Sequence, residues 1–277
     1  MDITTVTSFR PARTRSDLAL APGEVVMAGG TWLMSEPQPR TTGFVDLTTL
    51  GWPDIEITDT VLRIGATCTI ARLLAWAERE APAEWTSLAL ARPAADALLA
   101  SFKIWNTATV GGNVCQAFAA GAMIALLSTL DATALVWTPD GGERWIAVAE
   151  LVIDNAATSL APGEVVRALD VPLTALRARV GLQKIALAEL GRSGAVVTAR
   201  VDPDGTAVFV VTAAVRRPRV LRFARVPGAG ELRDAVASAD DFYTDPLGSA
   251  DWRRGVSVVL AERLRAELAR PAHEGAA

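Results

Sequence analysis

The chain has 277 residues, of which 51% are hydrophobic and 21% are charged, and its formal net charge is −4. This length and composition indicate a folded protein with two or three lobes rather than a disordered chain. The negative net charge argues against a protein that binds nucleic acid through its overall charge. Two cysteines and one histidine are too few for an iron–sulfur cluster, a histidine-rich metal site or a Ser-His-Asp triad on this chain. We therefore expect a bound cofactor to supply any chemistry.

The first segment, residues 1–54, is predicted to form a small lobe. Its expected elements are a helix and two strands, at Arg13–Leu20, Val25–Ala28 and Phe44–Leu47. The first of these strands leads directly into a glycine pair, Gly29 and Gly30. The turn at Gly51-Trp52-Pro53-Asp54 is typical of a boundary and ends the lobe.

The second segment, residues 55–175, alternates strands with helices. Strands are expected at Ile55–Ile57, Val61–Ala66, Ala134–Trp137, Trp145–Val148 and Val165–Leu169. Helices are expected after the N-cap Thr69, at Ala94–Phe102 and as a buried helix within Ala117–Leu127. A further apolar strand, Thr107–Val110, is predicted to run into a second glycine pair, Gly111 and Gly112.

No membrane segment or signal peptide is expected. The uncharged stretch from Ile104 to Leu130 is interrupted by Asn, Gln and Gly residues, and its continuous apolar part is too short for a span. The N-terminus has neither a basic region nor an apolar region of the secretory kind. Cys68 and Cys115 do not form a Cys-x-x-Cys motif, and we expect both to be small buried residues in a reducing, cytoplasmic compartment.

The third segment, residues 176–277, is rich in strand signals. Two runs, Ala195–Val201 and Ala207–Val215, flank Asp202-Pro203-Asp204-Gly205, which is a strong hairpin signal. Helices are expected at Glu231–Ala239 and Arg253–Ala269. Because neither glycine pair forms the Gly-x-Gly-x-x-Gly pattern, a Rossmann domain is disfavoured, and the predicted class is α+β.

The two glycine pairs are the sequence feature that points to a ligand. A strand that ends in Gly-Gly followed by a hydroxyl or amide residue leaves backbone N–H groups free for a phosphate that comes close. Two such turns suit a ligand with two phosphates, so we predict a dinucleotide cofactor between them. An ordinary strand-to-helix turn is the alternative for each pair.

These segments resemble the flavin subunit of the molybdenum hydroxylases, the medium subunit of xanthine dehydrogenase and carbon monoxide dehydrogenase. The resemblance covers nearly the whole chain in order. It rests on Ala28-Gly29-Gly30-Thr31-x-Leu33, Ile64-Gly65-Ala66-Thr67, Asn106-x-Ala108-Thr109-Val110-Gly111-Gly112-Asn113, Pro162-Gly163-Glu164-Val165-Val166, Lys184, Ala213-Ala214-Val215-x-x-Pro218-x-Val220-Leu221 and Asp245-x-x-Gly248-Ser249-Ala250-Asp251-Trp252-Arg253-Arg254.

The resemblance implies a two-lobed FAD-binding domain of the vanillyl-alcohol-oxidase/PCMH type, followed by an α+β flavoprotein C-terminal domain. It implies FAD as the cofactor and electron transfer as the role. A [2Fe–2S] small subunit and a molybdenum-cofactor large subunit would be the partners in a heterotrimer or its dimer, and the partners would choose the substrate. The electron acceptor stays open between nicotinamide nucleotide, oxygen, quinone and cytochrome.

The same resemblance implies a set of FAD-binding residues and no catalytic residue on this chain. Some of these positions also have plain structural readings: Val166 as a core strand residue, Lys184 as a surface lysine, and Trp32 as a ring that packs away from the cofactor. The implied residues are Ala28, Gly29, Gly30, Thr31, Trp32, Leu33, Leu99, Thr109, Gly111, Gly112, Asn113, Gln116, Val166 and Lys184.

Two positions depart from the family pattern. Ala122 stands where the family has a carboxylate expected to hold ribityl hydroxyls, and Arg192 stands near a position that is usually acidic. These departures keep two alternatives open: a docking subunit with a degenerate flavin site, and a stand-alone FAD-dependent oxidase, although the latter lacks a histidine base in a suitable segment. The arginines between Arg216 and Arg225 are read either as a solvated strand edge or as a docking surface.

Overall fold

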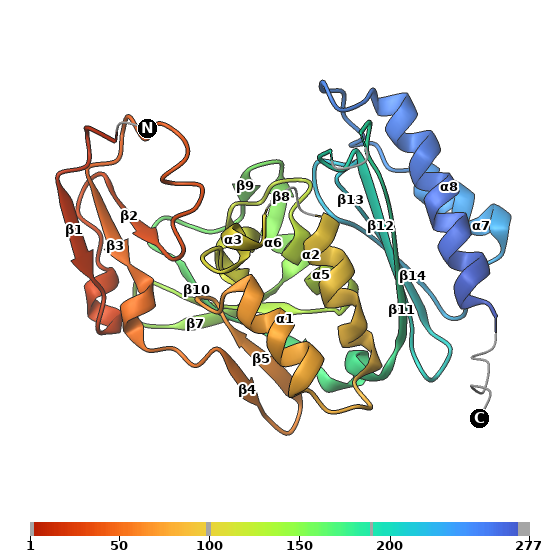
Figure 1. Ribbon diagram of the computed structural model, residues 1–277, viewed down its shortest axis with the longest axis horizontal. Helices are drawn as coiled ribbons and strands as arrows, with labels where there is room; N and C mark the ends of the chain where they lie inside the picture. The colour runs from red at the N-terminus through yellow and green to blue at the C-terminus, as the bar shows by residue number, and fades with distance from the viewer. Residues whose placement is uncertain (1–2, 98–100, 189–190, 271–277) are drawn as a thin grey trace.

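The computed structural model describes residues 3–97, 101–188 and 191–270 and shows three sheets that follow one another along the long axis of the molecule (Figure 1). The first is a three-stranded sheet of order β1-β3-β2, in which both outer strands run parallel to β3. Its elements are β1 (Ser8–Pro11), β2 (Glu24–Met27), β3 (Gly43–Asp46) and two 3-10 helices, η1 (Arg15–Leu18) and η2 (Leu47–Leu50).

The second sheet has five antiparallel strands in the order β4-β5-β10-β6-β7. These strands are β4 (Ile55–Ile57), β5 (Val61–Gly65), β6 (Thr133–Trp137), β7 (Glu143–Ala147) and β10 (Val165–Pro172). The accompanying elements are α1 (Ile70–Arg79), η3 (Thr86–Leu90), α2 (Ala91–Ala97), α3 (Phe102–Trp105), α4 (Val110–Cys115), α5 (Ala122–Thr129), α6 (Val148–Leu151), η4 (Leu173–Arg177) and the hairpin of β8 (Val152–Asp154) with β9 (Ala157–Thr158).

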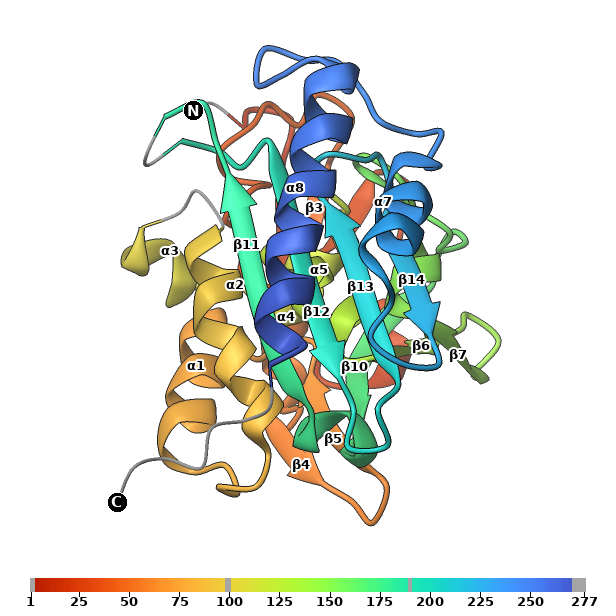
Figure 2. The same ribbon diagram turned by 90° about the vertical axis from the view of Figure 1, so that its right-hand side faces the viewer.

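The third sheet is an antiparallel meander of order β11-β12-β13-β14. Its strands are β11 (Arg179–Ile185), β12 (Ala195–Val201), β13 (Ala207–Thr212) and β14 (Arg219–Phe223). Helices α7 (Ala229–Ala237) and α8 (Ala250–Leu268) cover its outer face, as Figure 2 shows. Both central strands are buried along their whole length, because α5 lies against the inner face.

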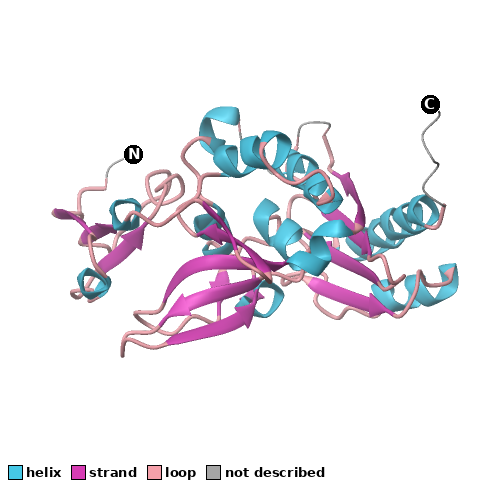
Figure 3. Ribbon diagram, turned by 90° about the horizontal axis from the view of Figure 1, so that it is seen from below, coloured by secondary structure: helices cyan, strands magenta, loops and turns pink. Residues whose placement is uncertain are grey.

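Helices lie between the strands of the second and third sheets (Figure 3), and α5 is the one that joins the two sheets into one body. All eight of its residues are buried, and it contacts β12 and β13 of the third sheet as well as α2, α4 and α6. A helix that is apolar on every side needs neighbours all round. The uncharged sequence therefore places α5 in the interior, and no helix of the described residues is both long enough and apolar enough to cross a bilayer.

Most predicted strands lie within a residue or two of the observed ones, but one predicted strand is wrong. Thr107–Val110 is not a strand, because the Thr109 side chain caps α4 by accepting a hydrogen bond from the Gly112 backbone N–H. The buried helix predicted within Ala117–Leu127 is present as α5, which begins at Ala122 and is preceded by Ala117 with a left-handed φ of 52°. The strands of each sheet fall inside one of the three predicted segments, while the domain limits themselves stay a prediction.

Shorter differences have local causes too. The helix expected at Arg13–Leu20 is the single 3-10 turn η1, whose start is fixed by the Asp17 carboxylate accepting from the backbone N–H of Arg13 and Thr14. The strand expected to reach Val215 ends at Thr212, because Ala213 has a left-handed φ of 62°. Part of the helix expected at Ala94–Phe102 lies outside the described residues.

A charged cluster joins the second sheet's lobe to the third sheet. Arg200, whose side chain is 5% exposed, contacts Asp131 at 2.7 Å and Asp202 at 2.9 Å, and Arg222 donates to Asp131 as well. Burial raises the pKa of Asp131, but the hydrogen bonds and charges of Arg222 and Arg200 outweigh it and hold this pKa below its usual range. Asp131 is therefore ionised in the folded protein at neutral pH.

We expect Asp131→Asn to lower the free energy of unfolding at pH 7 by about 1.5–3 kcal/mol, because it removes one of the two carboxylates that pair with the buried Arg200. A lowered folded-state pKa stabilises the protein above about pH 4, and this contribution is lost as the pH falls through the folded-state value. Urea unfolding at pH 7 and near pH 3 should therefore show a difference that shrinks in acid. Asp59→Asn, in an exposed turn, is the control and should change little.

Candidate functional site

The two glycine segments meet in space. Gly29 lies so close to the second segment that a Cβ placed on it would overlap the carbonyl oxygen of Thr107 and lie 3.2 Å from the Cα of Ala108. Only a residue without a side chain permits this approach of two backbones. The predicted convergence of the two segments is therefore present in the structure, at the junction of the first and second sheets.

The first glycine turn presents a run of free amides. Within the described part of the chain, no hydrogen bond is donated by the backbone N–H of any residue from Gly29 to Leu33. The turn is kept in shape by its carbonyl groups, since Gly30 O accepts from the N–H of Met34 at 2.9 Å, and Gly30 has a φ of 66°. Successive unpaired N–H groups are suited to an anion such as a phosphate.

The second glycine turn is different, and the expectation of unpaired amides there is wrong. The N–H of Gly111 donates to Ala66 O at 3.0 Å, and the N–H of Gly112 donates to Thr109 Oγ1 at 3.0 Å. Asn113 Oδ1 accepts from the N–H of Met123 and so caps α5. What this turn offers a ligand is the exposed Gly112 and the side-chain nitrogen Nδ2 of Asn113, which donates no hydrogen bond to any described residue.

Gly111 has a packing role. A Cβ on Gly111 would lie 2.5 Å from the Cβ of Ala66 and 2.7 Å from its carbonyl oxygen. Gly111 is buried, whereas Gly112 is exposed and a Cβ there would meet only Thr109 Oγ1, at 2.8 Å. The two adjacent glycines therefore have different roles: Gly111 lets α4 pack closely against the end of β5, and Gly112 leaves open space at the surface.

The remaining predicted residues divide between this junction and other places. Trp32 is 37% exposed and its ring stacks edge-to-face on Phe118 at 4.6 Å, so it belongs to the junction. Gln116, at the C-terminal end of α4, makes no side-chain hydrogen bond with a described residue. Val166 is 3% exposed and packs in the core of the second sheet. Leu99 lies outside the described residues.

Lys184 is joined to α2 in the structure. Its side chain is exposed and Nζ donates to the backbone oxygen of Asp96 at 3.0 Å. Of the two positions that depart from the family pattern, Ala122 is the buried first residue of α5, and Arg192 is exposed. Ala122 is only 2% exposed and packs among core residues. It therefore cannot make the hydrogen bonds to ribityl hydroxyls that the family's carboxylate is expected to make.

Stacked arginine and tryptophan side chains fix the first lobe to the second sheet. Trp52 and Trp137 pack edge-to-face at 5.3 Å, with the guanidinium of Arg167 4.7 Å from the centre of the Trp52 ring and that of Arg15 4.7 Å from the Trp137 ring. Arg15 also donates to Thr138 O at 3.3 Å. These cation–π contacts therefore link η1 and the segment before β4 to strands β6 and β10.

Neither cysteine offers a reactive thiolate. Burial raises the pKa of Cys68 and of Cys115 to about 12, so both are thiols at neutral pH. Among the described residues, no three His, Cys, Asp or Glu side chains come together as a metal site would require. The site is thus built from backbone groups, glycines and amides rather than from acids and bases.

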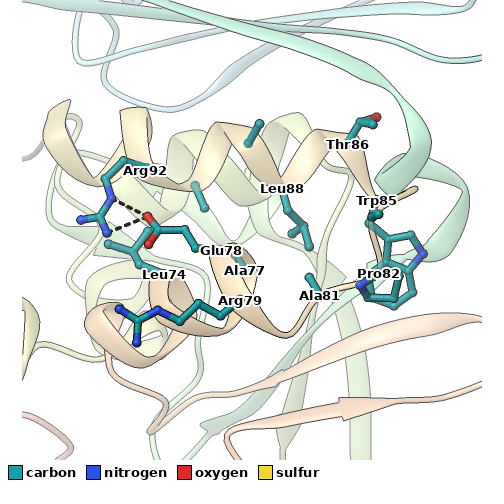
Figure 4. Close-up of a pocket in the computed structure, with 13 residues that line it drawn as sticks. Leu74, Ala77, Glu78, Arg79, Ala81, Pro82, Trp85, Thr86, Leu88 and Arg92 are labelled. Carbon is teal, nitrogen blue, oxygen red and sulfur yellow. Dashed lines mark hydrogen bonds and ion pairs between the residues drawn. The ribbon is translucent and has the colours of Figure 1, made fainter.

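A surface cavity of about 450 Å³ lies elsewhere, between α1 and the η3–α2 segment (Figure 4). Leu74, Trp85 and Leu88 line it, and the ion pair between Glu78 and Arg92, at 2.7 Å, stands at one end. Among the predicted cofactor-binding residues that the structure describes, none lines this cavity. It is therefore separate from the glycine junction.

Solved structures share this fold over nearly the whole chain. Quinoline 2-oxidoreductase from Pseudomonas putida 86 matches with a TM-score of 0.80 and 19% identity over 97% of this chain and 98% of that one. Reconstituted CO dehydrogenase from Oligotropha carboxidovorans matches with a TM-score of 0.80 and 20% identity, over 96% and 99%. Carbon monoxide dehydrogenase from Hydrogenophaga pseudoflava lacking the Mo-pyranopterin moiety matches with a TM-score of 0.79 and 18% identity, over 95% and 97%.

These similarities confirm the predicted α+β fold, including the third sheet and its helices. The class of protein is that of the FAD-binding flavoprotein chains of molybdenum hydroxylases. Residues 8–174 match the family described as the FAD binding domain in molybdopterin dehydrogenase, and the chain belongs to this family. Its cofactor is accordingly FAD. No match was found among curated proteins.

Sequence reasoning missed Phe118 and the segment around it. This segment follows the second glycine pair and contacts the first one through Trp32. The only sequence signal was a lone aromatic residue in an alanine-rich stretch, where the family pattern has other residues. The partner of Phe118, Trp32, lies far away in the sequence, and the segment is positioned by backbone hydrogen bonds of Ala117 and Ala119, which residue types do not reveal.

Proposed function

We propose that this chain binds FAD at the glycine junction and transfers electrons from a [2Fe–2S] partner subunit to an external acceptor. A molybdenum-cofactor subunit would carry out substrate hydroxylation in the same complex. The observation that carries the proposal is the run of unpaired N–H groups from Gly29 to Leu33, set against a second glycine segment at a backbone approach that only glycine allows. The family match and the similarity to quinoline 2-oxidoreductase and CO dehydrogenase support it.

The residues present fit the diphosphate of FAD. The N–H groups of Gly29, Gly30 and Thr31 would donate to phosphate oxygens, with Trp32 and Leu33 continuing the row. A hydrogen bond to a charged group contributes about 1.5–3 kcal/mol, so several such donors suffice for firm binding. The run of free N–H groups argues against a fully degenerate flavin site.

The second segment would contribute by shape and by side-chain amides. Gly112 would let the cofactor approach the backbone, while Asn113 and Gln116 would donate to phosphate or ribityl oxygens. Thr109 would hold the turn by capping α4. By the family resemblance, Val166 and Leu99 would lie against the isoalloxazine ring, and Lys184 would place a positive charge near the flavin. Ala122 removes a carboxylate contact, which would cost about 1–3 kcal/mol of affinity.

The chemistry on this chain would be that of the cofactor alone. Bound FAD supplies the capacity to take up electrons from a one-electron carrier and to release them to an acceptor. The protein's part is to hold the cofactor and to dock the partners, because the described residues include no cluster suited to a metal. Substrate choice would lie on the molybdenum-cofactor subunit, and two protonated cysteines fit a reducing, cytoplasmic setting.

FAD titration of the purified chain tests the proposal. We expect a stoichiometric yellow complex with a flavin absorption spectrum, and quenching or enhancement of flavin fluorescence that saturates with added FAD. The isolated chain should not oxidise a hydroxylase substrate, whereas the complex with both partners should. A colourless chain that leaves FAD fluorescence unchanged would contradict the proposal. Substrate turnover by the isolated chain would favour a stand-alone oxidase instead.

A further inference from the structure

The segment from Ala117 to Gly121, here called the α4–α5 segment, is held by hydrogen bonds from two sides. Within its own lobe, Ala119 N–H donates to Asn155 Oδ1 at 2.9 Å, and the carbonyl of Ala117 accepts from Ala156 N–H at 2.8 Å. From the third sheet, Ala213 N–H donates to the carbonyl of Ala119 at 2.7 Å. The position of this segment is therefore set partly by a residue far along the chain.

The same segment supports the first glycine turn. Phe118 packs against Trp32 with ring centres 4.6 Å apart and planes at 75°. Trp32 belongs to the run of residues whose N–H groups are free in the described chain. Edge-to-face aromatic pairs hold two segments in a defined geometry. A shift of Phe118 would therefore change the surroundings of the predicted diphosphate donors.

On the other side of Ala213 lies a buried charged cluster. Arg253 is 0% exposed, and its Nη1 donates to Gly194 O at 2.7 Å and to the carbonyl of Ala213. Tyr243 Oη donates to the same carbonyl at 3.0 Å, and the Arg253 guanidinium lies 4.2 Å from the Tyr243 ring centre. Asp245 pairs with Nη2 of Arg253. Two donors thus fix one carbonyl, and that carbonyl belongs to Ala213.

The backbone of Ala213 indicates that this arrangement is imposed by its surroundings. Its φ is 62°, a left-handed conformation that alanine rarely adopts. Residues persist in such conformations only where neighbouring contacts determine them, and such residues cluster at functional sites. The contacts made there are the two donors to its carbonyl, the bond from its N–H to Ala119, and a tight turn in which Ala214 N–H donates to Thr212 O at 2.7 Å.

We propose that the cluster of Tyr243, Arg253 and Asp245 positions the α4–α5 segment through Ala213, and thereby keeps the first glycine turn in its FAD-binding conformation. The inference rests on the proposed binding of FAD at the glycine junction. These are positioning residues, since they act through Ala213 and Phe118. The third sheet, which lies beyond the matched residues 8–174, then sets the affinity for FAD.

Tyr243→Phe tests this proposal, because it removes one hydrogen bond to Ala213 O and keeps the ring under Arg253. We expect the dissociation constant for FAD to rise about fivefold, and the visible circular dichroism of the bound flavin to change. The matched control is Val201→Ala, a buried residue at the opposite end of β12 from Gly194. It should lower the unfolding midpoint and leave both flavin readouts unchanged.

A double-mutant cycle separates positioning from general loosening. Phe118→Leu removes the ring contact with Trp32, so adding Tyr243→Phe to it should weaken FAD binding by less than the product of the two single effects. Independent effects would overturn the inference, as would an unchanged dissociation constant in Tyr243→Phe. Should Tyr243→Phe fail to fold, Asp245→Asn provides the same comparison. A wild-type chain that does not bind FAD would defeat the proposed function, whereas wild-type binding that Tyr243→Phe leaves unchanged defeats only this inference.

Discussion

Gly29→Ala is expected to weaken FAD binding about a hundredfold while leaving a folded protein. A Cβ at this position would overlap the carbonyl oxygen of Thr107 and lie 2.8 Å from its carbonyl carbon, and neither atom belongs to a flexible side chain. The two backbones must then separate, at a cost of about 1–3 kcal/mol. Because the separation opens the junction that would clamp the diphosphate, most of the cost should appear in the binding of FAD.

The measurement is the dissociation constant for FAD by fluorescence titration, with a parallel unfolding curve. Gly255→Ala is the matched control, since this glycine lies exposed inside α8 and a Cβ there would have no described neighbour within 4 Å. It should stabilise the helix by about 0.5–1 kcal/mol and leave FAD binding unchanged. Wild-type affinity in Gly29→Ala would mean that the close approach of the two segments does not matter to the cofactor.

The convergence of the two glycine segments could be predicted from the sequence because its physical cause is local. A glycine pair after an apolar strand indicates a place where another backbone comes close, and Gly29 meets Thr107 and Ala108 in this way. The strands and the long final helix follow equally from periodicity and from turn residues such as Asp202-Pro203-Asp204-Gly205.

The hydrogen-bonding state of the second glycine pair could not be predicted in this way. The β-branched residues before it favour a strand, yet Thr109 caps a helix, and its hydroxyl takes the N–H of Gly112. The N–H of Gly111 finds its acceptor in Ala66, which is distant in sequence. Which amides stay free is decided by such tertiary partners, and residue types do not reveal them.

The contribution of the third sheet to the site was hidden for a related reason. Its connection to the α4–α5 segment runs between backbone atoms of Ala213 and Ala119, and alanine carries no side chain that would indicate it. The motif around Arg253 could be matched to the family, but its contact with Ala213 O is visible only in three dimensions.

Gly112→Trp is expected to abolish FAD retention and to leave the unfolding transition close to that of the wild type. Gly112 is exposed, and the one atom within 4 Å of a Cβ built there is Thr109 Oγ1, at 2.8 Å. A side chain on Gly112 therefore points into space outside the described core. If the cofactor lies there, the indole ring would occupy its place. The measurement is the flavin absorbance that remains with the protein after gel filtration.

The neighbouring Gly111 provides the contrast that makes this result specific. Gly111→Ala would put a Cβ 2.5 Å from the Cβ of Ala66 inside the core, so it should lower the free energy of unfolding by about 1–3 kcal/mol. Substitutions at the two adjacent glycines would then have different effects: Gly111→Ala would lower stability, whereas Gly112→Trp would block the binding of the cofactor. If the unfolding curve of Gly112→Trp matches that of the wild type and FAD is nevertheless retained, the cofactor avoids this turn, and the site would have to be sought along the first turn alone.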